Sequence, residues 1–376
     1  MFEIRVNGRT WRLWKSANVS RSLDDNCASF RFESSSQGPG SFPIKLGDAV
    51  QILQGGRNIL SGFADEIEAS GSLDGHTIAV SGRDKVGDLV DSSVPDAAKA
   101  LSGNLSMLSV AKAVVSALKL GIKVIDRSGG RASKTQKDIK SADSGQSCSA
   151  FLQEYAAKAQ VYLISDGDGN LVLWRPTGSR AETPLLHRKS GEQNNVMTAS
   201  LRLTLADRFH RYVVRVQDNP SSDDDALPGL ESEGEGTSRT ASAIDSQVRV
   251  TRYLEIKGEG SMTASDLAGR ANEEANLRRA RSTEYRASVQ GDSQASGAPW
   301  AIGDLIRVQD DFNGVQRDML LRSISISVDI SGGSRSEMTL APEEAYTTVP
   351  QTRRRRRARA KDGDDELERL LTTGSS

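Results

Sequence analysis

One short stretch of the sequence mixes charged side chains closely enough to raise the question of chemistry. Residues 80–94, VSGRDKVGDLVDSSV, begin as a strand that ends at Ser81-Gly82 and continue as a charged turn and an apolar and acidic segment. Its charged residues could do acid–base chemistry or hold an assembly together; they are Arg83, Asp84, Lys85, Asp88 and Asp91.

Residue types that bind metals or act as nucleophiles are scarce or badly spaced in the sequence. None of the three histidines (His76, His187 and His210) stands in a paired spacing such as HExxH. Cys27 and Cys148 are far apart and form no CxxC. The sequence contains no GxSxG, no P-loop and no GxGxxG between a strand and a helix. We therefore expect no catalytic residue, no metal and no cofactor.

Two acidic patterns need a separate judgement. Asp166 to Asn170 resembles the start of a calcium loop, but Leu171 and Thr177 stand where glycine and a bidentate glutamate are needed, so a hairpin turn is favoured. Paired carboxylates of a glycoside hydrolase stay open, because their separation is a three-dimensional property. The acidic residues nevertheless gather in polar segments, where a raised pKa is not expected.

Length and composition predict a protein of several domains without a strong overall field. A chain of 376 residues is long enough for about two to four domains. Its 49 basic and 50 acidic residues nearly cancel, so the whole molecule has no charge that would attract DNA or an anionic membrane. The sequence predicts no signal peptide and no membrane span, and its two separate cysteines indicate a reducing compartment.

Strand-like alternation predicts a first small β-barrel over residues 1–94. Phe2 to Val6 leads through the turn Asn7-Gly8 into a hairpin. Further strands are expected at 28–33, 49–53, 59–69 and 76–81.

An α+β domain is expected over residues 95–180. Ser106 can cap a helix over 107–120, with Gly121 as its left-handed C-cap, and a second helix is expected over 149–160. The run VYLISDGDGNLVLW predicts a hairpin over 161–174.

The second half of the chain repeats a motif of the first. PIKLGDAVQI at 43–52 matches PWAIGDLIRV at 299–308, and both place a Gly-Asp turn before an alternating strand. The turn residues are Gly47, Asp48, Gly303 and Asp304. We therefore expect a second, related β-barrel, formed by residues 181–217 and 285–349. The predicted fold class is α+β, rich in strand and multidomain, with two related small β-barrels and helix-containing α+β domains between and beside them.

Residues 218–284 are expected to form an insertion in the second barrel. The acidic residues 218–245 are interpreted as a mobile surface loop. A helix is expected to follow up to about Arg281, because Thr263 and Asp266 have the spacing of a capping box.

The C-terminal residues 350–376 are charged and are expected to be flexible. Seven basic residues between 353 and 361 precede an acidic block, and no aromatic residues are interleaved for base stacking. The tail is interpreted either as a segment that docks on a partner or as a disordered tail without one. The candidate docking residues are Arg353, Arg354, Arg355, Arg356, Arg357, Leu367, Leu370 and Leu371.

The order of these elements resembles the baseplate hub family of Mu-like phages, which is related to the T4 hub and to the hub-like part of type VI secretion spike proteins. The resemblance covers roughly residues 1–350. It is carried by the two Gly-Asp strand entries, by the 80–94 stretch, and by the helix and hairpin that end in GNLVLW. The Arg-rich tail has no place in the family pattern.

The resemblance implies a structural, non-enzymatic protein of the virion tail baseplate that assembles in the host cytoplasm. It implies a homotrimer in which two barrels per chain form a pseudo-sixfold ring. Such a ring joins the tail tube to the central spike, contacts other baseplate proteins and gives DNA a passage. Two alternatives remain, a tail-tip peptidoglycan hydrolase and a nucleic-acid-binding module that uses the Arg-rich tail.

For residues 80–94 the resemblance implies a structural role. Gly82 is expected to permit the turn, and Asp84 or Asp88 is expected to cap the backbone that follows. Leu89 and Val90 are expected to anchor the exit strand to the barrel.

Overall fold

The computed structural model describes residues 2–35, 43–72, 75–217, 238–258, 264–331 and 333–346. The hairpin expected at the N-terminus is confirmed, with Asn7 and Gly8 at φ angles of 51° and 77°. One strand of this region, Trp14–Ser22, was not expected. The N-terminal strands are β1 (Phe2–Val6), β2 (Arg9–Trp11), β3 (Trp14–Ser22), β4 (Ser29–Ser35), β5 (Ala49–Gln54), β6 (Arg57–Ser72) and β7 (Gly75–Asp84).

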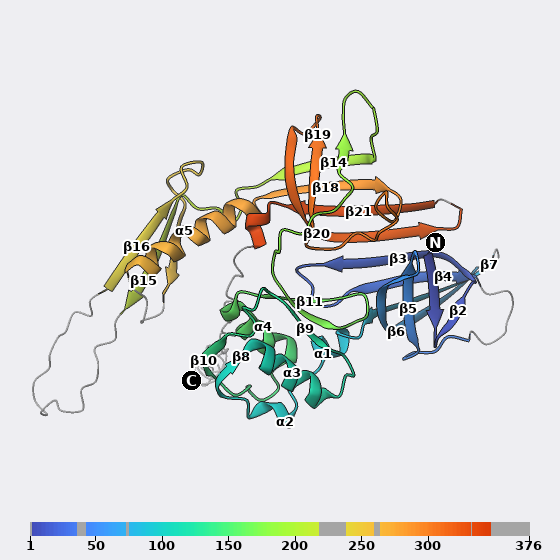
Figure 1. The fold of residues 1–376 in the computed structure, drawn as a ribbon, viewed down its shortest axis with the longest axis horizontal. Helices are drawn as coiled ribbons and strands as arrows, with labels where there is room; N and C mark the ends of the chain where they lie inside the picture. Colours follow the sequence, from blue (N-terminus) through green and yellow to red (C-terminus); the bar gives the residue numbers. More distant parts are fainter. Residues whose placement is uncertain are drawn as a thin grey trace, which may run out of the picture.

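The C-terminal strands belong to the same sheet as the N-terminal ones. They are β13 (Leu185–His187), β14 (Val196–Leu203), β18 (Thr283–Gln290), β19 (Leu305–Asp310), β20 (Val315–Asp329) and β21 (Gly333–Ala341), followed by the 3-10 turn η1 (Glu343–Tyr346). The 13-stranded sheet runs in the order β14-β18-β21-β20-β3-β4-β7-β6-β5-β1-β2; β19 also pairs with β20, and β13 pairs with β19. Antiparallel pairing of β20 with β3 joins its two halves (Figure 1).

A single apolar core lies beneath both halves of the sheet. Phe32, Ile52 and Leu60 from the N-terminal strands belong to the same buried cluster as Ile306 and Leu321 from the C-terminal strands. The two units that the sequence predicts therefore share a core, because the β3–β20 pairing brings their apolar faces together.

The α+β domain lies below the sheet in Figure 1 and has a core of its own. Ser106 and Ser147 cap its two long helices by accepting hydrogen bonds from Ser109 N and Ala150 N. The left-handed C-cap of the first helix is Lys119, at φ 55°, and not Gly121. The elements are α1 (Gly87–Asp91), α2 (Asp96–Lys99), β8 (Gly103–Ser106), α3 (Met107–Leu118), β9 (Val124–Arg127), β10 (Thr135–Ile139), α4 (Cys148–Ala159), β11 (Tyr162–Ser165) and β12 (Leu171–Trp174).

The hairpin β11–β12 connects this domain to the large sheet. Its alternating side chains enter the two cores in turn, since Leu163 and Leu173 pack with the helices while Ile164 and Trp174 pack with the sheet. The residues that resembled a calcium loop form its turn, where Asp166 Oδ1 accepts hydrogen bonds from the backbone of Asp168 and Asn170. Both faces of this hairpin are therefore buried.

An arm projects from the sheet between β14 and β18 (Figure 1). It consists of β15 (Arg211–Gln217), β16 (Ser238–Ile244), β17 (Tyr253–Lys257) and α5 (Ala264–Arg281). The helix packs through Leu267, Ala271 and Ala275 on the three-stranded sheet. The expected place of residues 211–217 in the second barrel is wrong, because β15 pairs with β16 and β17 in the arm. The expected loop over 218–245 is also wrong for its last part, which is β16.

Some sequence expectations lie outside the described residues. These are the Arg-rich tail with all its candidate docking residues, the acidic residues 218–237 and the capping residue Thr263. No helix within the described ranges is long and apolar enough to cross a membrane.

Candidate assembly interface

The strands of the two halves follow one plan. In the N-terminal half the pairing order is β3-β4-β7-β6-β5, and in the C-terminal half it is β14-β18-β21-β20-β19. Each strand of the first set therefore has an equivalent in the second. The arm takes the place, between β14 and β18, that a short turn takes between β3 and β4.

Register shifts occur at matching places in the two halves, so that single residues of one half can be assigned to single residues of the other. The register of β6 with β7 shifts between Ala64 and Glu66, and that of β20 with β21 shifts between Leu321 and Ser323. Likewise, β3 with β4 shifts between Trp14 and Ser16, and β14 with β18 between Val196 and Thr198. Because a bulge fixes the register of the strand around it, the two halves can be aligned position by position.

The repeated Gly-Asp motif makes the same backbone contacts in both halves. Gly47 N donates to Ala64 O at 2.8 Å, and Ala64 N donates to Asp48 O at 2.9 Å. Gly303 N and Asp304 O make the corresponding bonds to Leu321, at 2.8 and 2.9 Å. Both glycines have positive φ angles, 83° and 89°. The motif thus fixes the start of β5 against the bulge in β6, and the start of β19 against the bulge in β20.

The seam between the halves is formed by β3 and β20. Seven residue pairs align, from Ser323 opposite Ser22 to Asp329 opposite Ser16. On the polar face, Asn18 Nδ2 donates to Ser325 Oγ at 2.8 Å and to Ser327 Oγ at 2.9 Å. The seam is therefore stabilised by backbone pairing, by a buried apolar side and by side-chain hydrogen bonds on the opposite face.

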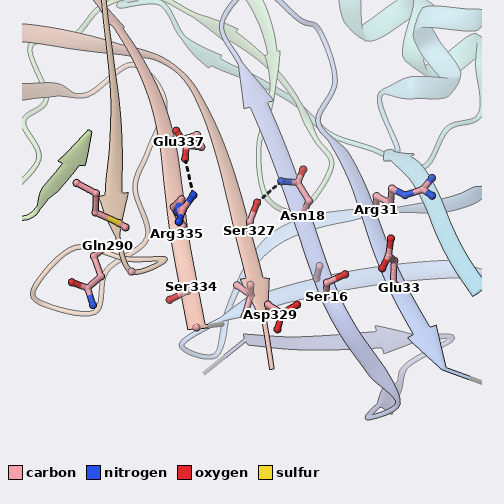
Figure 2. A pocket seen from close by; sticks show the side chains of 15 residues that line it. Ser16, Asn18, Arg31, Glu33, Gln290, Ser327, Asp329, Ser334, Arg335 and Glu337 are labelled. Atoms are coloured by element: carbon pink, nitrogen blue, oxygen red, sulfur yellow. Dashed lines mark hydrogen bonds and ion pairs between the residues drawn. The ribbon is translucent and has the colours of Figure 1, made fainter. Parts of the chain in front are cut away.

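The polar face of the seam is concave. Figure 2 shows side chains of β3, β4, β20 and β21 that line a hollow on this face. The volume of the hollow is about 910 Å³. Its charged lining residues are two arginines and three carboxylates, namely Arg31, Glu33, Asp329, Arg335 and Glu337. Arg335 and Glu337 lie 3.9 Å apart and are about half exposed, and Ser288 Oγ donates to Glu337 at 2.8 Å. This face therefore carries uncharged polar side chains and charges of both signs, with one more carboxylate than arginines.

Gly82 has a different role from the one expected. It lies inside β7, which continues to Asp84, so the turn expected at this residue is wrong. A Cβ atom at Gly82 would lie 2.0 Å from Phe63 O in β6. Glycine is needed here because the two strands approach closely beside the bulge.

Asp84 is buried, and its carboxylate receives two backbone donors. Ala28 N donates to Oδ2 at 2.7 Å, and Val86 N donates to Oδ1 at 3.0 Å. Burial raises the pKa of Asp84. Of the two expected capping residues, Asp84 binds the backbone ahead of α1 through its carboxylate, whereas Asp88 accepts a hydrogen bond from Ser92 N through its backbone oxygen.

The other charged residues of the 80–94 stretch hold β6, β7 and α1 together. Arg83 Nη1 donates to Asp91 Oδ1 at 3.0 Å, and the guanidinium lowers the pKa of Asp91. Arg83 N also donates to Asp65 Oδ2 at 3.0 Å, and Lys85 N donates to Ser61 O at 3.0 Å. These contacts favour a structural role for the stretch over acid–base chemistry.

The segment after β7 is anchored to a different core from the one expected. It forms the short helix α1 and not a strand, and Leu89 is fully buried among residues of the α+β domain. Val90, the other expected anchor, is only partly buried. The exit from the first strand unit is therefore fixed by the neighbouring domain.

A buried carboxylate that sequence reasoning missed lies at the end of β19. Asp310 accepts hydrogen bonds from Tyr285 Oη at 2.9 Å and from Asn313 Nδ2 at 2.7 Å, and His187 Nδ1 lies 3.2 Å away. Burial alone would raise the pKa of Asp310, but these donors and the backbone N–H of Asn313 outweigh it and lower the pKa to about 2. The equivalent residue of the first half, at the end of β5, is the uncharged Gln54, so the repeated motif did not point to a carboxylate at 310.

Clusters suited to metal binding are not found in the described ranges: no three His, Cys, Asp or Glu side chains are grouped for an ion. Cys148 is buried and Cys27 is partly buried, and desolvation raises the pKa of each thiol to about 11. The charged residues described above therefore hydrogen-bond strands and turns to one another.

Three family models match the chain in domain order. They are the N-terminal domain of Mu phage baseplate assembly protein GpP-like proteins at residues 1–84, the second domain of baseplate hub protein gp44-like proteins at 86–175, and the fourth domain of Mu phage baseplate assembly protein GpP at 263–349. The fold and these domains together define a phage tail baseplate hub protein.

Individual proteins agree with the family models. Baseplate hub protein gp44 of Escherichia phage Mu is 24% identical over 371 residues, which cover 96% of this chain and 92% of that protein. The 43 kDa tail protein of prophage MuSo2 from Shewanella oneidensis has a TM-score of 0.75 and 26% identity, covering 92% of this chain and 98% of that one. The chain belongs to the Mu-like baseplate hub family, and the resemblance found in the sequence is confirmed.

The fold extends to a secretion-system protein. The E. coli c3393 protein, described as a component of the type VI secretion system with structural similarity to the T4 tail proteins gp27 and gp5, has a TM-score of 0.53. Its identity is 10%, over 93% of this chain and 79% of that one, so this likeness concerns the fold alone. As a member of the hub family, the chain is a structural component of the phage tail baseplate.

Proposed function

We propose that this baseplate hub protein acts as a homotrimeric ring that joins the tail tube to the central spike and leaves a passage for DNA. The observation that carries the proposal is the residue-level equivalence of the two strand units. Three chains with two equivalent units each supply six similar units, which suits a ring between a sixfold tube and a threefold spike.

The polar face of the seam supports a passage for DNA. Strong retention of DNA requires lysines or arginines that replace the counterions of the phosphates. The hollow on this face is lined by two arginines and three carboxylates, and its other polar side chains are three serines, an asparagine and a glutamine. A wall of this kind offers hydrogen bonding to water without net attraction for a polyanion.

We further propose that the protein acts by assembly and not by catalysis, in the virion tail and, before that, in the host cytoplasm. The buried carboxylates Asp84 and Asp310 already bind backbone or side-chain donors, and the carboxylates of the hollow are solvated. The hydrolase and nucleic-acid alternatives are not favoured by the family relationship.

Light scattering coupled to size exclusion, across a concentration series, tests the ring. A mass of three times the 40.5 kDa chain is expected. A single-chain mass at every concentration would contradict a ring formed by this chain alone. Loss of turbidity of purified cell walls, abolished by one Asp or Glu substitution, would instead establish the hydrolase.

A further inference from the structure

Two long strand edges of the large sheet have no paired neighbour among the described residues; the other edge strands, β2 and β13, are only three residues long. Strand β14 is the terminal strand and pairs only with β18. In β6, residues 57–63 pair with β5 on one side and residues 62–72 pair with β7 on the other, so residues 64–72 have no neighbour on the β5 side. Long unpaired edges are usually covered or paired, because their N–H and C=O groups are ready to bind another strand.

The equivalents of these two edges are paired with each other inside the chain. Strand β3 corresponds to β14, and the second half of β20 corresponds to the second half of β6. The seam β3–β20 therefore shows that two edges of this kind can pair antiparallel with each other. Within one chain, β14 and β6 lie in opposite halves of the sheet, on either side of that seam.

We propose that β14 of one copy pairs antiparallel with residues 66–72 of β6 in the next copy, repeating the β3–β20 seam. This inference rests on the proposed trimer and identifies the contact between neighbouring chains in the ring. The matched bulges set the register: Leu203 lies opposite Ile67, Arg202 opposite Glu68, and Leu201 opposite Ala69.

The side chains on the apolar side complement one another in this register. Leu203 is 69% exposed, although it lies on the same face of β14 as Leu201, which is partly buried against the core. An exposed apolar side chain beside the core is typical of an interaction surface. Ile67 is packed against the main core from the edge of the sheet. Pairing covers Leu203 with Ile67 and extends the core from one copy into the next.

The side chains on the polar side are complementary in charge. In the chain's own seam, Ser20 and Ser325 face each other with their Oγ atoms 3.0 Å apart. The equivalent positions between copies are Arg202 and Glu68. Directly opposite residues of unlike charge stabilise an antiparallel pair, and Glu68 already lies 3.0 Å from Arg31 on its own sheet. A glutamate between two arginines favours this neighbour and register over others.

The arrangement is head to tail. Each chain offers β14 at one end and β6 at the other, so pairing continues until the rotation closes the ring. Seams within chains (β3–β20) then alternate with seams between chains (β14–β6).

Disulfide cross-linking of the full-length chain tests the register. The variant carries Glu68→Cys and Arg202→Cys, which the proposed pairing places within disulfide reach only between copies. The wild-type chain, which contains the partly buried Cys27 and the buried Cys148, is oxidised in parallel and should give no such bands. Mild oxidation should give bands of two and three chains on a non-reducing gel, which reductant removes.

A matched variant, Glu68→Cys with Thr198→Cys, controls for chance encounters. Thr198 lies on the same face of β14 but about 13 Å further along the strand, outside disulfide reach. This control variant should cross-link at least about tenfold more slowly than the 68–202 variant, which corresponds to a preference of about 1.4 kcal/mol for the proposed register. Equal cross-linking of both variants would overturn the register.

Light scattering on the same samples separates failure of the pairing from failure of the ring. A trimeric mass without a 68–202 link overturns the β14–β6 seam while leaving the trimer in place. A monomeric mass overturns both. Charge reversal gives a second readout: Glu68→Arg and Arg202→Glu should each weaken association about tenfold, and their combination should restore it. Additive loss in the double variant would contradict the pairing.

Discussion

At the scale of single residues, Gly303 and Asp310 make contacts that their neighbours in the sequence do not predict. Gly303 was identified from its repeated motif, whereas Asp310 was missed because nothing in its neighbours marks a buried carboxylate. A sequence shows which residues recur, but the donors that converge on Asp310 come from β18, from the residues after β19 and from β13. Such convergence is a property of the folded chain.

Asp310→Asn should lower stability in a pH-dependent way. The folded pKa of Asp310 is about 2 and lies below its usual value, so its contribution is present above about pH 4 and disappears as the pH falls to about 2. The wild type should exceed the variant by roughly 2 kcal/mol at pH 7 and by almost nothing at pH 2. Urea unfolding at several pH values measures this, with the exposed Asp25→Asn as control.

Gly303→Ala should be more harmful than Gly47→Ala, although the two glycines have nearly the same φ angle. Both changes force alanine into a left-handed conformation, at about 1–2 kcal/mol. At Gly303 the new Cβ would also lie 2.4 Å from the Trp174 ring, whereas none of the atoms around Gly47 comes within 4 Å. Overpacking adds about 1–3 kcal/mol. Equal melting temperatures of the two variants would show that the Trp174 contact is not rigid.

At the scale of elements, the sequence revealed the strands with apolar alternation and missed the one that joins the two halves. In β3 only Ala17 and Val19 face the core from the centre of the strand, while Ser16, Asn18 and Ser20 face solvent. Serine and asparagine have weak strand propensity, so the segment did not stand out. The strand exists because β4 and β20 pair with it on both sides, which is information from the tertiary fold.

Ile326→Ala should destabilise the seam more than Ser327→Ala does. Ile326 is 3% exposed and lies opposite Val19, so truncation leaves a cavity that costs about 2–5 kcal/mol. The adjacent Ser327 lies on the polar face and accepts one hydrogen bond from Asn18, worth about 0.5–1.5 kcal/mol. Thermal unfolding of the two variants measures the difference. A larger loss for Ser327→Ala would reverse the assignment of the two faces.

At the scale of the whole molecule, balanced charge on the concave face should let duplex DNA pass without retention. A chain truncated after residue 352, which lacks the Arg-rich tail, should show no binding to duplex DNA at physiological salt. Replacing Glu33, Asp329 and Glu337 by lysine should create binding whose affinity falls steeply as salt rises. Fluorescence anisotropy across a salt series measures both. Tight binding by the truncated wild-type chain would contradict the proposed passage.

The arm has a consequence for symmetry. It occupies one of two equivalent positions, since β14 and β18 are separated by it whereas β3 and β4 are joined by a short turn. In a ring of six units built from three chains, every second unit would carry an arm. The inner sheet would then repeat every 60°, while the outer contour would repeat every 120°. Three copies of one polypeptide would thus present six nearly identical strand units together with three identical arms.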